Sequence, residues 1–480
     1  MSKMVKNEEV YKGLESIVGS KNISTRDADR IAYGRDAFQL KVMQYRLPSI
    51  LKQPLPDYIV WVESIQQISR ILKLANEKKV PVIPYGGGAG VNGGIVPLTG
   101  GISLDLKKLR RMELHEEANY VLCQAGVIGQ HLENFLNQKG YTLGHLPSSL
   151  TTSSIGGFIA TRSAGALSSL YGSIENMVLD LEVVLPSGQV VHTNPTRVPR
   201  KATGPNFNEL FIGSEGTFGI VTDACLKIRR NPDIREFAGF LFPTLTTGLQ
   251  AVRTIMNLGI RPSIIRLYEA VEARMVYHIE EIEKDQSYLT LSFDGYEETK
   301  AFVEDQKKVC TEICLKAGAK DMGDEGGKVW FKNRLNMYYP NPDWIKMNIL
   351  ADTIDVVTTY NNLENLFYKM KEAMQSKKIN IMAHWSHFYL EGGSMYLIFV
   401  MLEKDTEKEQ KASNLFKETW TKGLKACLEN GGSISHHHGI GIFRGAYMEQ
   451  ELGPGIYDLL KGIKNYLDPN GIMNPGKLGL

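Results

Sequence analysis

The sequence predicts an α+β protein of two domains, in which a second α+β unit interrupts the first. Three observations predict this fold class. The chain has 480 residues, which is longer than the range served by one hydrophobic core, so two domains are expected. Strand and helix patterns alternate in the first part of the chain and surround three glycine-rich loops. After Asn231-Pro232 the pattern changes to longer strands and helices, before short loops return near the end.

The composition is that of an ordinary water-soluble protein, with 43% hydrophobic and 22% charged residues. The 55 basic and 53 acidic residues leave a net charge of +2, which gives no electrostatic basis for binding nucleic acid or an anionic membrane. The five scattered cysteines favour a reducing compartment over a disulfide framework. No apolar run of signal or transmembrane length is visible. We therefore expect a cytoplasmic protein with no integral membrane segment and no nucleic-acid partner.

The first elements follow an α/β pattern. Residues 8–35 predict an amphipathic helix, a turn at Gly19 and a second short helix. Residues 56–61 predict a strand, residues 64–78 a helix, and residues 80–84 a second strand. A strand–helix–strand order of this kind is typical of a small parallel sheet covered by a helix.

The second strand runs into the first glycine-rich loop, residues 85–94, which holds six glycines in ten residues. Glycine allows positive φ and a close approach of the backbone, so several amide N–H groups can converge on a phosphate. The loop lacks the Lys-Ser/Thr of a Walker loop, and a strand at 102–106 follows where a dinucleotide-binding Rossmann turn needs a helix. A flexible surface loop is the alternative interpretation.

Two further loops repeat this style. Residues 144–157, continuing to 161–165, are rich in small and hydroxyl side chains and contain Arg162, which could pair with an anionic group. Residues 213–222 precede a strand. Between them, residues 178–192 predict a hairpin that turns at Pro186-Ser187-Gly188-Gln189.

Three consecutive histidines, His436, His437 and His438, stand in a natural sequence with apolar flanks. Consecutive residues point in different directions, so three adjacent imidazoles cannot all bind one metal ion. They can instead present one or two rings to a ligand, and imidazole exchanges protons near physiological pH. A solvated polar loop is the alternative.

The segment between residues 234 and 432 alternates strand-like and helix-like runs and holds two further candidates. Arg334 follows an aromatic pair on a helix expected to begin near Lys328, and an arginine fork recognises carboxylate or phosphate. Tyr396 lies in an apolar strand, where a buried phenol needs a hydrogen-bond partner. Taken alone, a surface arginine and a core tyrosine are the simpler interpretations.

The three glycine-rich loops, in this order and at these separations, resemble the cofactor loops of the FAD-binding fold shared by vanillyl-alcohol oxidase and p-cresol methylhydroxylase. The resemblance implies a two-subdomain FAD-binding domain (1–233), an inserted α+β substrate or cap domain (234–432) and a C-terminal return to the FAD domain (433–480). The implied FAD contacts are Pro84, Tyr85, Gly86, Gly87, Gly88, Ala89, Gly90, Pro147, Ser148, Ser149, Leu150, Thr151, Thr152, Ser153, Thr161, Arg162, Ser163, Ala164, Glu215, Gly216, Thr217, Phe218, Gly219, Ile220 and Val221.

No histidine or cysteine lies in the first glycine-rich loop, so the resemblance favours noncovalent FAD, although His145 stands just before the second cofactor loop. Ala89 stands where a serine or threonine is common in this family, and Phe218 where leucine is common. Neither change removes a backbone donor.

Within this superfamily the chain is most similar to the alkylglycerone-phosphate synthase branch, through 56–61, 146–165, 171–176, 213–222 and above all 431–441. The resemblance implies that Tyr396, His437 and His438 are active-site acid/base groups, with His436 beside them, and that Arg334 orients the substrate.

The flavin dehydrogenases for D-lactate, glycolate and related acids form the neighbouring branch. They usually carry Gly-Glu-His-Gly at the histidine run and a histidine-containing segment that supplies metal ligands. Here His437 replaces the glutamate and Tyr396 the last histidine of that segment, so we expect no metal ion. A site built from His384, His387 and one histidine of the run is the minority alternative, because residues i and i+3 of a regular strand point to opposite faces.

Two chemistries fit these residues. The first is FAD-dependent oxidation of a small anionic hydroxyl substrate, a 2-hydroxy acid or polyol phosphate, by hydride transfer to flavin N5. The second is alkylglycerone-phosphate synthesis, an acyl-to-alkyl exchange through a flavin N5 adduct. We favour the oxidoreductase, because no basic amphipathic helix or extended apolar loop indicates a membrane face, and because the ending Asn474-Pro475-Gly476-Lys477-Leu478 is like that of the dehydrogenases.

A non-catalytic FAD electron-transfer subunit is the third alternative. The expected partners are the substrate, an electron-transfer protein or iron–sulfur subunit, and a second copy of the chain in a homo-oligomer.

Overall fold

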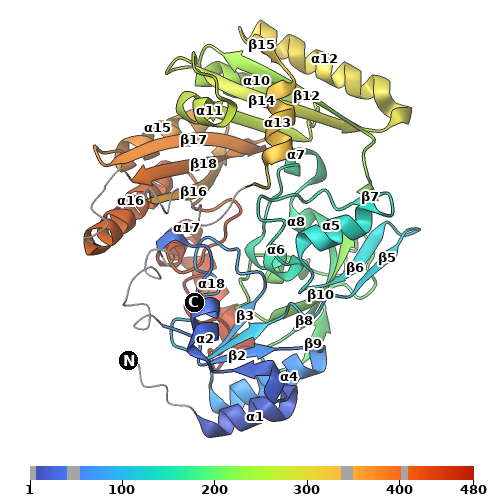
Figure 1. Ribbon diagram of the computed structural model, residues 1–480, viewed down its shortest axis with the longest axis vertical. Helices are drawn as coiled ribbons and strands as arrows, with labels where there is room; N and C mark the ends of the chain where they lie inside the picture. Colours follow the sequence, from blue (N-terminus) through green and yellow to red (C-terminus); the bar gives the residue numbers. More distant parts are fainter. Residues whose placement is uncertain (1–6, 41–53, 337–349, 402–408) are drawn as a thin grey trace.

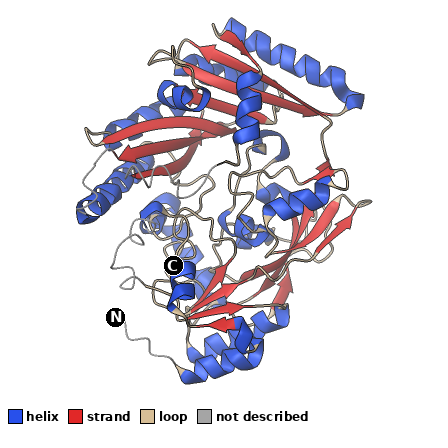
Figure 2. Cartoon of the chain, in the orientation of Figure 1, coloured by secondary structure: helices blue, strands red, loops and turns tan. Residues whose placement is uncertain are grey.

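The structure is a computed structural model that describes residues 7–40, 54–336, 350–401 and 409–480. Three sheets of four, five and seven strands form its framework. Figure 1 shows the seven-stranded sheet in the upper part of the molecule and the four- and five-stranded sheets side by side in the lower part, with loops and short helices between the two parts. Figure 2 shows that long loops, rather than helices or strands, fill much of this middle region.

The four-stranded sheet is the predicted strand–helix–strand unit. Its order is β1-β2-β4-β3, with β2 and β3 both parallel to β4 and β1 antiparallel to β2. Apolar residues of α1 and α4 form one hydrophobic core with these strands. The side chains of Asn7 and Ser64 cap the two helices by accepting backbone N–H groups, which fixes where each helix begins. The bounds are α1 Glu8–Val18, β1 Ile23–Ser24, α2 Asp27–Tyr33, β2 Tyr58–Trp61, α4 Ile65–Lys78, β3 Val82–Tyr85 and β4 Ile102–Asp105.

The five-stranded sheet is antiparallel, in the order β5-β6-β10-β8-β9. The predicted hairpin is β8–β9, and Gly188 takes a φ of 83° in its turn, a conformation that favours glycine. Short helices carry the second and third glycine-rich loops against this sheet. The bounds are β5 Met112–His115, β6 Tyr120–Gln124, α5 Gly129–Asn137, β7 Tyr141–Thr142, α6 Ile155–Thr161, α7 Ser168–Tyr171, α8 Ile174–Met177, β8 Val178–Val184, β9 Val190–His192, α9 Asn208–Phe211, β10 Ile220–Lys227 and β11 Arg229–Arg230.

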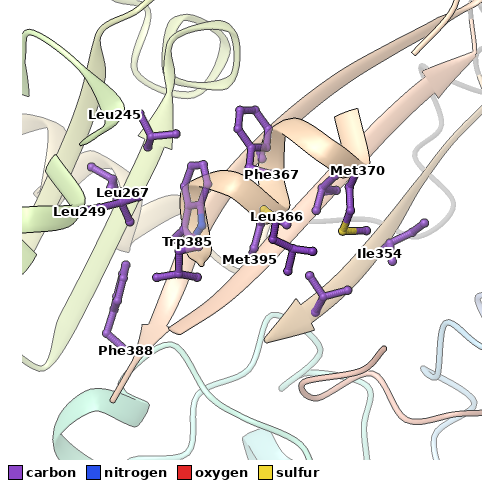
Figure 3. Packing of buried hydrophobic residues seen from close by; sticks show 14 of the residues in the cluster. Leu245, Leu249, Leu267, Ile354, Leu366, Phe367, Met370, Trp385, Phe388 and Met395 are labelled. Carbon is purple, nitrogen blue, oxygen red and sulfur yellow. The ribbon is translucent and has the colours of Figure 1, made fainter. Parts of the chain in front are cut away.

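The seven-stranded antiparallel sheet has the order β15-β12-β14-β13-β17-β18-β16. One face packs on α10, α12, α15 and α16 and forms the largest hydrophobic core. Figure 3 shows Trp385 of β17 in this core, beside Leu267 of β13 and Phe367 of α15. The bounds are β12 Ile234–Phe242, α10 Leu245–Asn257, β13 Ile264–Glu269, α11 Ala270–Tyr277, β14 Ser287–Gly295, α12 Lys300–Lys316, β15 Lys320–Gly323, α13 Glu325–Asn333, β16 Leu350–Thr359, α15 Leu363–Met374, β17 Ile379–Phe388, β18 Gly392–Met401 and α16 Glu409–Glu429.

The other face of this sheet is polar. Asp355 on β16 lies opposite Tyr396 on β18, and Tyr396 lies opposite His384 on β17. His384 in turn lies opposite Tyr268 on β13. Directly opposed residues share a face, so these side chains form one row across four strands, on the side away from α10, α12, α15 and α16.

A β-bulge in β17 brings His387 to the same polar face. Trp385 pairs with Met395 and Phe388 with Gly393, so β17 advances three residues where β18 advances two. Both Trp385 and Phe388 therefore point into the core (Figure 3). The expectation that His384 and His387 point to opposite faces is wrong, because it assumed a regular strand.

The chain ends by returning to the first sheet. After η5 Arg444–Tyr447, α17 Met448–Leu452 and α18 Pro454–Leu467, the backbone of Val82 on β3 exchanges hydrogen bonds with Ile472 and Asn474. Lys464 of α18 donates to the carbonyl oxygen of Thr217, in the third glycine-rich loop, at 2.9 Å. In the described part of the chain, no helix is long and apolar enough to cross a membrane.

Arg334 does not lie near the start of a helix as expected. Helix α13 begins at Glu325, before Gly326-Gly327, and Arg334 is its C-cap residue. The helix continues through the two glycines because close packing against β12 leaves no room for a side chain. A Cβ at Gly327 would lie 2.8 Å from the ring of Phe237 on β12. Tertiary packing has overridden the low helix propensity of glycine.

Candidate functional site

The three glycine-rich loops converge on one place. A Cβ atom at Gly87 would overlap the carbonyl oxygen of Thr152, and one at Gly216 would lie 2.9 Å from the ring of Pro84. Residues from the loops around 87, 152 and 216 therefore touch one another, and only glycine permits the contact. The predicted cofactor residues 84–90, 147–153 and 215–221 are thus brought together.

The first loop offers unused backbone donors. Among the described residues, the amide N–H groups of Gly87, Gly88 and Ala89 donate to no protein acceptor. Consecutive free amides in a glycine-rich turn form a concave site for an anionic oxygen. Lys107 lies beside this loop, where its Nζ donates to the carbonyl oxygen of Gly86 at 3.0 Å and forms an ion pair with the buried Asp105 at 2.7 Å. The loop therefore fits the pyrophosphate of a dinucleotide.

Arg162 lies differently from the expectation that it pairs with an external anion. It caps the end of α6 in the left-handed conformation, with a φ of 53°. Its guanidinium forms ion pairs with Glu209 at 3.1 Å and Glu175 at 3.5 Å. Both partners are carboxylates of this chain, so Arg162 is already neutralised without a ligand.

The third loop contacts residues 436–441, which we call the histidine loop. The buried carboxylate of Glu215 accepts hydrogen bonds from the amides of Ile440 and Gly441 at 2.7 to 3.0 Å. Asn92, from the first loop, donates to the carbonyl oxygens of His438 and Gly439. The histidine loop therefore lies directly against two of the predicted cofactor loops.

Asp355 holds the other half of the histidine loop. One of its carboxylate oxygens, Oδ2, accepts the amides of His436, His437 and His438 at 2.9, 2.6 and 3.0 Å. The other, Oδ1, accepts from the guanidinium of Arg444 at 2.6 Å, and both side chains are fully buried. The arginine and the hydrogen-bonding amides hold the pKa of Asp355 well below its usual range despite its burial.

The rings of the histidine loop form a stack with side chains of the polar sheet face. His387 stacks on His436 at a centroid distance of 4.9 Å, and it meets His437 edge-on at 4.9 Å. Tyr396 lies 6.2 Å from His437 and 5.2 Å from His438. The predicted catalytic residues Tyr396, His436, His437 and His438 are thus all in one cluster, and His387 joins them.

The imidazoles of this cluster are held neutral. Burial lowers the pKa of His436 and His437 to about 3 and that of His438 to about 4. Burial also lowers the pKa of His145 to about 3; its Nε2 contacts Ser163 Oγ at 2.8 Å, and its buried Nδ1 has no partner. A neutral imidazole can accept a proton on one nitrogen while it donates from the other, so the cluster is suited to proton transfer.

His384 is fully engaged by its neighbours. Its Nε2 faces the guanidinium of Arg266 at 2.8 Å and its Nδ1 faces Glu272 at 2.7 Å. Arginine can only donate, so His384 carries its proton on Nδ1. Neither nitrogen is left for a metal ion, and the alternative site containing His384 is therefore not supported.

The nearest ring nitrogens of His387, His436 and His437 lie within 4.8 Å of one another, close enough to surround an ion. The two Nδ1 atoms of His436 and His437 are 2.9 Å apart, which is a hydrogen-bond distance. The expectation that no metal is bound stays a prediction.

Arg334 lies away from the histidines. It lines a cavity of about 390 Å³ together with Leu146, Leu150 and Arg235, and its guanidinium stacks on the ring of Phe331 at 3.8 Å. Burial and the positive charge of Arg235 lower the pKa of Arg334 to about 10. None of its described contacts reaches the histidine loop. Arg334 lies beside the second cofactor loop rather than beside Tyr396, and its expected role in orienting the substrate stays a prediction.

Three functional candidates were missed by sequence reasoning. Arg266 lies on β13 and Asp355 on β16, two strands that the sequence analysis did not identify, and Glu272 lies on the short helix α11. Single charged residues inside apolar strand patterns, such as Arg266 in Ile-Ile-Arg-Leu-Tyr and Asp355 in Thr-Ile-Asp-Val-Val, were the available signal.

Two family models together match most of the chain. Residues 56–194 match the FAD binding domain, and residues 231–478 match the C-terminal domain of FAD linked oxidases. A Trypanosoma brucei brucei alkyldihydroxyacetonephosphate synthase is 30% identical over 455 residues, 88% of this chain and 73% of the relative. An Escherichia coli K12 FAD-linked oxidoreductase of uncharacterised activity is 30% identical over 449 residues, 88% of this chain and 89% of the relative. A probable mitochondrial D-lactate dehydrogenase of Danio rerio is 28% identical over 487 residues, 98% of this chain and 92% of the relative.

Two solved structures share the fold. An alkyldihydroxyacetonephosphate synthase superposes with a TM-score of 0.81 at 24% identity, covering 98% of this chain and 85% of that one. A p-cresol methylhydroxylase with substrate bound superposes with a TM-score of 0.78 at 17% identity, covering 98% and 96%. These likenesses confirm the predicted p-cresol methylhydroxylase type of FAD-binding fold. With the family models matching both parts of the chain, the protein is an FAD-binding enzyme that belongs to the FAD-linked oxidase family.

Proposed function

We propose that this enzyme oxidises a small anionic hydroxyl compound, a 2-hydroxy acid or a polyol phosphate, with noncovalent FAD as the oxidant. The observation that carries the proposal is the cluster of neutral histidines and Tyr396 against the cofactor loops. Oxidation of an alcohol needs a group that takes the hydroxyl proton, and a neutral imidazole does this without first losing a proton of its own. The relative named as a D-lactate dehydrogenase acts on a substrate of this class.

The fit of FAD rests on the converging loops. Residues 84–90 would hold the pyrophosphate through the free amides of Gly87, Gly88 and Ala89, and residues 147–153 and 215–221 would surround the flavin. When bound, FAD supplies the acceptor for the hydride that leaves the substrate carbon. The chain's own residues bind and orient the substrate, and His437, His438 or Tyr396 takes its hydroxyl proton.

Two arginines can hold the anionic group of the substrate. Arg334 lines the cavity next to the second cofactor loop, with its Nε buried and unpaired. Arg266 lies closer to the histidines, through its contact with His384, but it is already engaged by His384 and Tyr268. We favour Arg334 as the anchor, because its guanidinium has no carboxylate partner among the described residues. Arg266 already forms hydrogen bonds with His384 and Tyr268.

The deciding experiment is anaerobic mixing of the FAD-loaded protein with D- and L-2-hydroxy acids and with glycerol phosphates. Bleaching of the flavin absorbance, with formation of the corresponding carbonyl compound, is the expected result. Absence of bleaching by every member of both substrate classes contradicts the proposal.

The second candidate is the exchange of the acyl group of acylglycerone phosphate for an alkyl chain, without net redox change. It is favoured by the run His436-His437-His438 and by relatives named alkyldihydroxyacetonephosphate synthase. Incubation of the protein with acylglycerone phosphate and a labelled fatty alcohol tests it. Formation of labelled ether product, together with no bleaching by hydroxy acids, would make it the function.

Replacement of Tyr396 by Phe separates binding from chemistry in either case. The phenol lies beside His437 and His438 on the polar sheet face, so its loss should lower the rate of turnover by about 10²–10⁴-fold. FAD should remain bound at wild-type stoichiometry. Tyr288→Phe is the matched control, since Tyr288 lies on the same face three strands away. Turnover at the wild-type rate in Tyr396→Phe would remove Tyr396 from the acid/base groups.

A further inference from the structure

We propose that Tyr389 and His436 form a relay that carries the substrate proton from His437 to solvent. The proposal rests on the proposed function, because only a reaction that releases a proton at the histidines needs such a path. His437 and Tyr396 are only partly exposed, and a bound substrate would cover them further.

A continuous line of hydrogen bonds leads from His437 to the surface. Nδ1 of His437 lies 2.9 Å from Nδ1 of His436, and Nε2 of His436 lies 2.7 Å from the hydroxyl of Tyr389. The side chain of His437 is only 14% exposed, and Tyr389 as a whole residue is 37% exposed. The line therefore leads from the candidate site to a partly exposed residue, whose hydroxyl also lies beside Ser173.

The rings of the relay are fixed in place. Asp355 binds the backbone amides of both His436 and His437, so the loop that carries the rings cannot swing. His387 stacks on His436, and Ser168 holds Nδ1 of His387 at 2.6 Å. Proton transfer between two nitrogens requires a short and stable separation, and these contacts supply it.

The line can transfer a proton without leaving a charge in the protein. In the starting arrangement His437 donates from Nδ1 to His436, His436 donates from Nε2 to Tyr389, and Tyr389 donates to water. With FAD bound, the flavin would accept the hydride, with both electrons, as the substrate C–H bond breaks. The hydroxyl proton moves to Nε2 of His437. The Nδ1 proton of His437 then passes to His436, the Nε2 proton of His436 to Tyr389, and the hydroxyl proton of Tyr389 to water.

The balance is one proton taken from the substrate hydroxyl and one delivered to solvent, and the substrate becomes a carbonyl compound. Each residue of the relay is again neutral, which suits a buried site where a trapped charge is costly. After product leaves, the relay runs in reverse: solvent gives one proton to Tyr389, the hydroxyl proton of Tyr389 passes to Nε2 of His436, and the Nδ1 proton of His436 passes to Nδ1 of His437. Water entering the site takes the Nε2 proton of His437, so one proton enters, one leaves, and the starting arrangement is restored.

The first test needs no substrate. Histidine side-chain nitrogen NMR on the FAD-loaded protein reports which ring nitrogen of His436 carries the proton. Tyr389→Phe should change the tautomer balance of His436 and of His437. Tyr360→Phe is the matched control, because Tyr360 donates to the backbone carbonyl of Tyr389 at 2.9 Å and is not part of the relay. An unchanged His436 signal in Tyr389→Phe would overturn the relay.

The second test uses a hydroxyl substrate that bleaches the flavin. Tyr389→Phe should slow the bleaching about 10-fold or more, and the rate in mixtures of H₂O and D₂O should change from a curved to a linear dependence on the deuterium fraction, because fewer protons then move together. His436→Ala should slow the bleaching more than Tyr389→Phe does, and added free imidazole should restore the rate. An equal curvature in wild type and Tyr389→Phe, with FAD content and melting temperature unchanged, would overturn the relay.

The two tests separate this proposal from the proposed function. If no hydroxyl substrate bleaches the flavin, the proposed function fails, while the NMR experiment still decides whether Tyr389, His436 and His437 share protons.

Discussion

The carboxylate of Asp355 is fully buried, and groups of the candidate site compensate its charge. Its carboxylate accepts three consecutive amides and one guanidinium. Replacing it by Asn removes the charge that pairs with the fully buried Arg444 and points an amide donor at the same guanidinium or at the loop. Breaking a buried ion pair in this way costs about 3–5 kcal/mol of unfolding free energy. Urea unfolding of Asp355→Asn should show a loss of this size.

Asp352→Asn is the matched control for this prediction, since Asp352 is on the same strand and equally buried. Burial raises the pKa of Asp352 to about 7, so this carboxyl is largely neutral in mildly acidic buffer. Trp420 Nε1 donates to Oδ2 of Asp352 and the amide of Thr353 to Oδ1, so the single oxygen of Asn can keep one of these hydrogen bonds and the other is lost. At pH 6 its loss should cost about 1 kcal/mol. Equal losses for both variants would show that the charge of Asp355 does not matter to the fold.

Glu272 makes the stability of the fold depend on pH, because its pKa is raised, whereas that of Asp355 is lowered. Burial raises its pKa to about 8 in the folded protein, from an ordinary value of 4.5. A carboxyl with a raised folded-state pKa stabilises the fold fully below the unfolded pKa, and this contribution is lost as the pH rises through the folded pKa. Glu272→Gln removes the cost of ionising the buried group. The variant should gain stability relative to wild type between pH 5.5 and pH 8.5.

The measurement is the difference in urea midpoint between Glu272→Gln and wild type at the two pH values. Taking the difference cancels the titration of the other buried groups, including the histidines, whose lowered pKa values act in the opposite direction by favouring the fold as pH rises. A difference that stays constant, or that moves against the variant as pH rises, would contradict the raised pKa of Glu272.

At the scale of elements, the contact between the first two cofactor loops depends on Gly87. Its Cβ position is occupied by the backbone carbonyl of Thr152, and backbone cannot move aside as a side chain can. Gly87→Ala should therefore push the two loops apart and weaken FAD binding. We expect the Kd for FAD to rise about 100-fold or more, because each 1.4 kcal/mol of lost binding free energy raises the Kd tenfold. The ratio of flavin to protein absorbance after dialysis measures this.

Gly94→Ala tests whether the loss of FAD binding is specific to position 87. Gly94 is in the same loop, and its nearest new contact is Glu215 Cδ at 4.0 Å, an ordinary van der Waals distance. This variant should keep FAD at the wild-type ratio. Retention of FAD by Gly87→Ala as well would show that the loops do not need their close contact.

Strongly periodic elements could be predicted from the sequence, whereas irregular ones could not. The helix expected at 64–78 is found at Ile65–Lys78, and the apolar strand expected around Tyr396 is found at Gly392–Met401. The bulge after Trp385 could not be predicted. In a strand buried on both faces, no alternation of polar and apolar residues shows where an extra residue is inserted. It decides that His387 joins the histidine loop, so this part of the site was beyond sequence reasoning.

Charged residues inside strands explain the other gaps. Arg266 and Asp355 interrupt apolar runs, which lowers the strand signal, and their partners His384 and Arg444 lie more than eighty residues away along the chain. The histidine run and the glycine-rich loops were found because each is unusual locally. The roles assigned to Tyr396, His437, His438 and Arg334 stay predictions, and so do the domain bounds at 233 and 432.

At the scale of the whole molecule, the last residues hold the cofactor loops to the first sheet. Lys464 is buried, and its Nζ donates to the carbonyl oxygens of Thr217 and Met473 and to Asp468 at 2.5 to 2.9 Å. Asp468 also accepts the amides of Ile472 and Met473. One ammonium group therefore joins α18, the third cofactor loop and the terminal segment that pairs with β3.

Lys464→Met keeps the length of the side chain but removes its charge and its three hydrogen bonds. Asp468 is then a buried carboxylate without its cation, so the loss in unfolding free energy should be about 3–5 kcal/mol. Because Thr217 is in the third cofactor loop, FAD should also dissociate more readily. Lys461→Met, on the exposed side of the same helix, should change neither property, since Lys461 forms a surface ion pair with Asp458 and lies over the ring of Tyr457, away from the cofactor loops. If Lys464→Met kept both wild-type stability and FAD affinity, the C-terminal segment would have no part in holding the cofactor loops. A partial recovery in Lys464→Met/Asp468→Leu would show that the unpaired carboxylate, rather than the lost contacts, accounts for the damage.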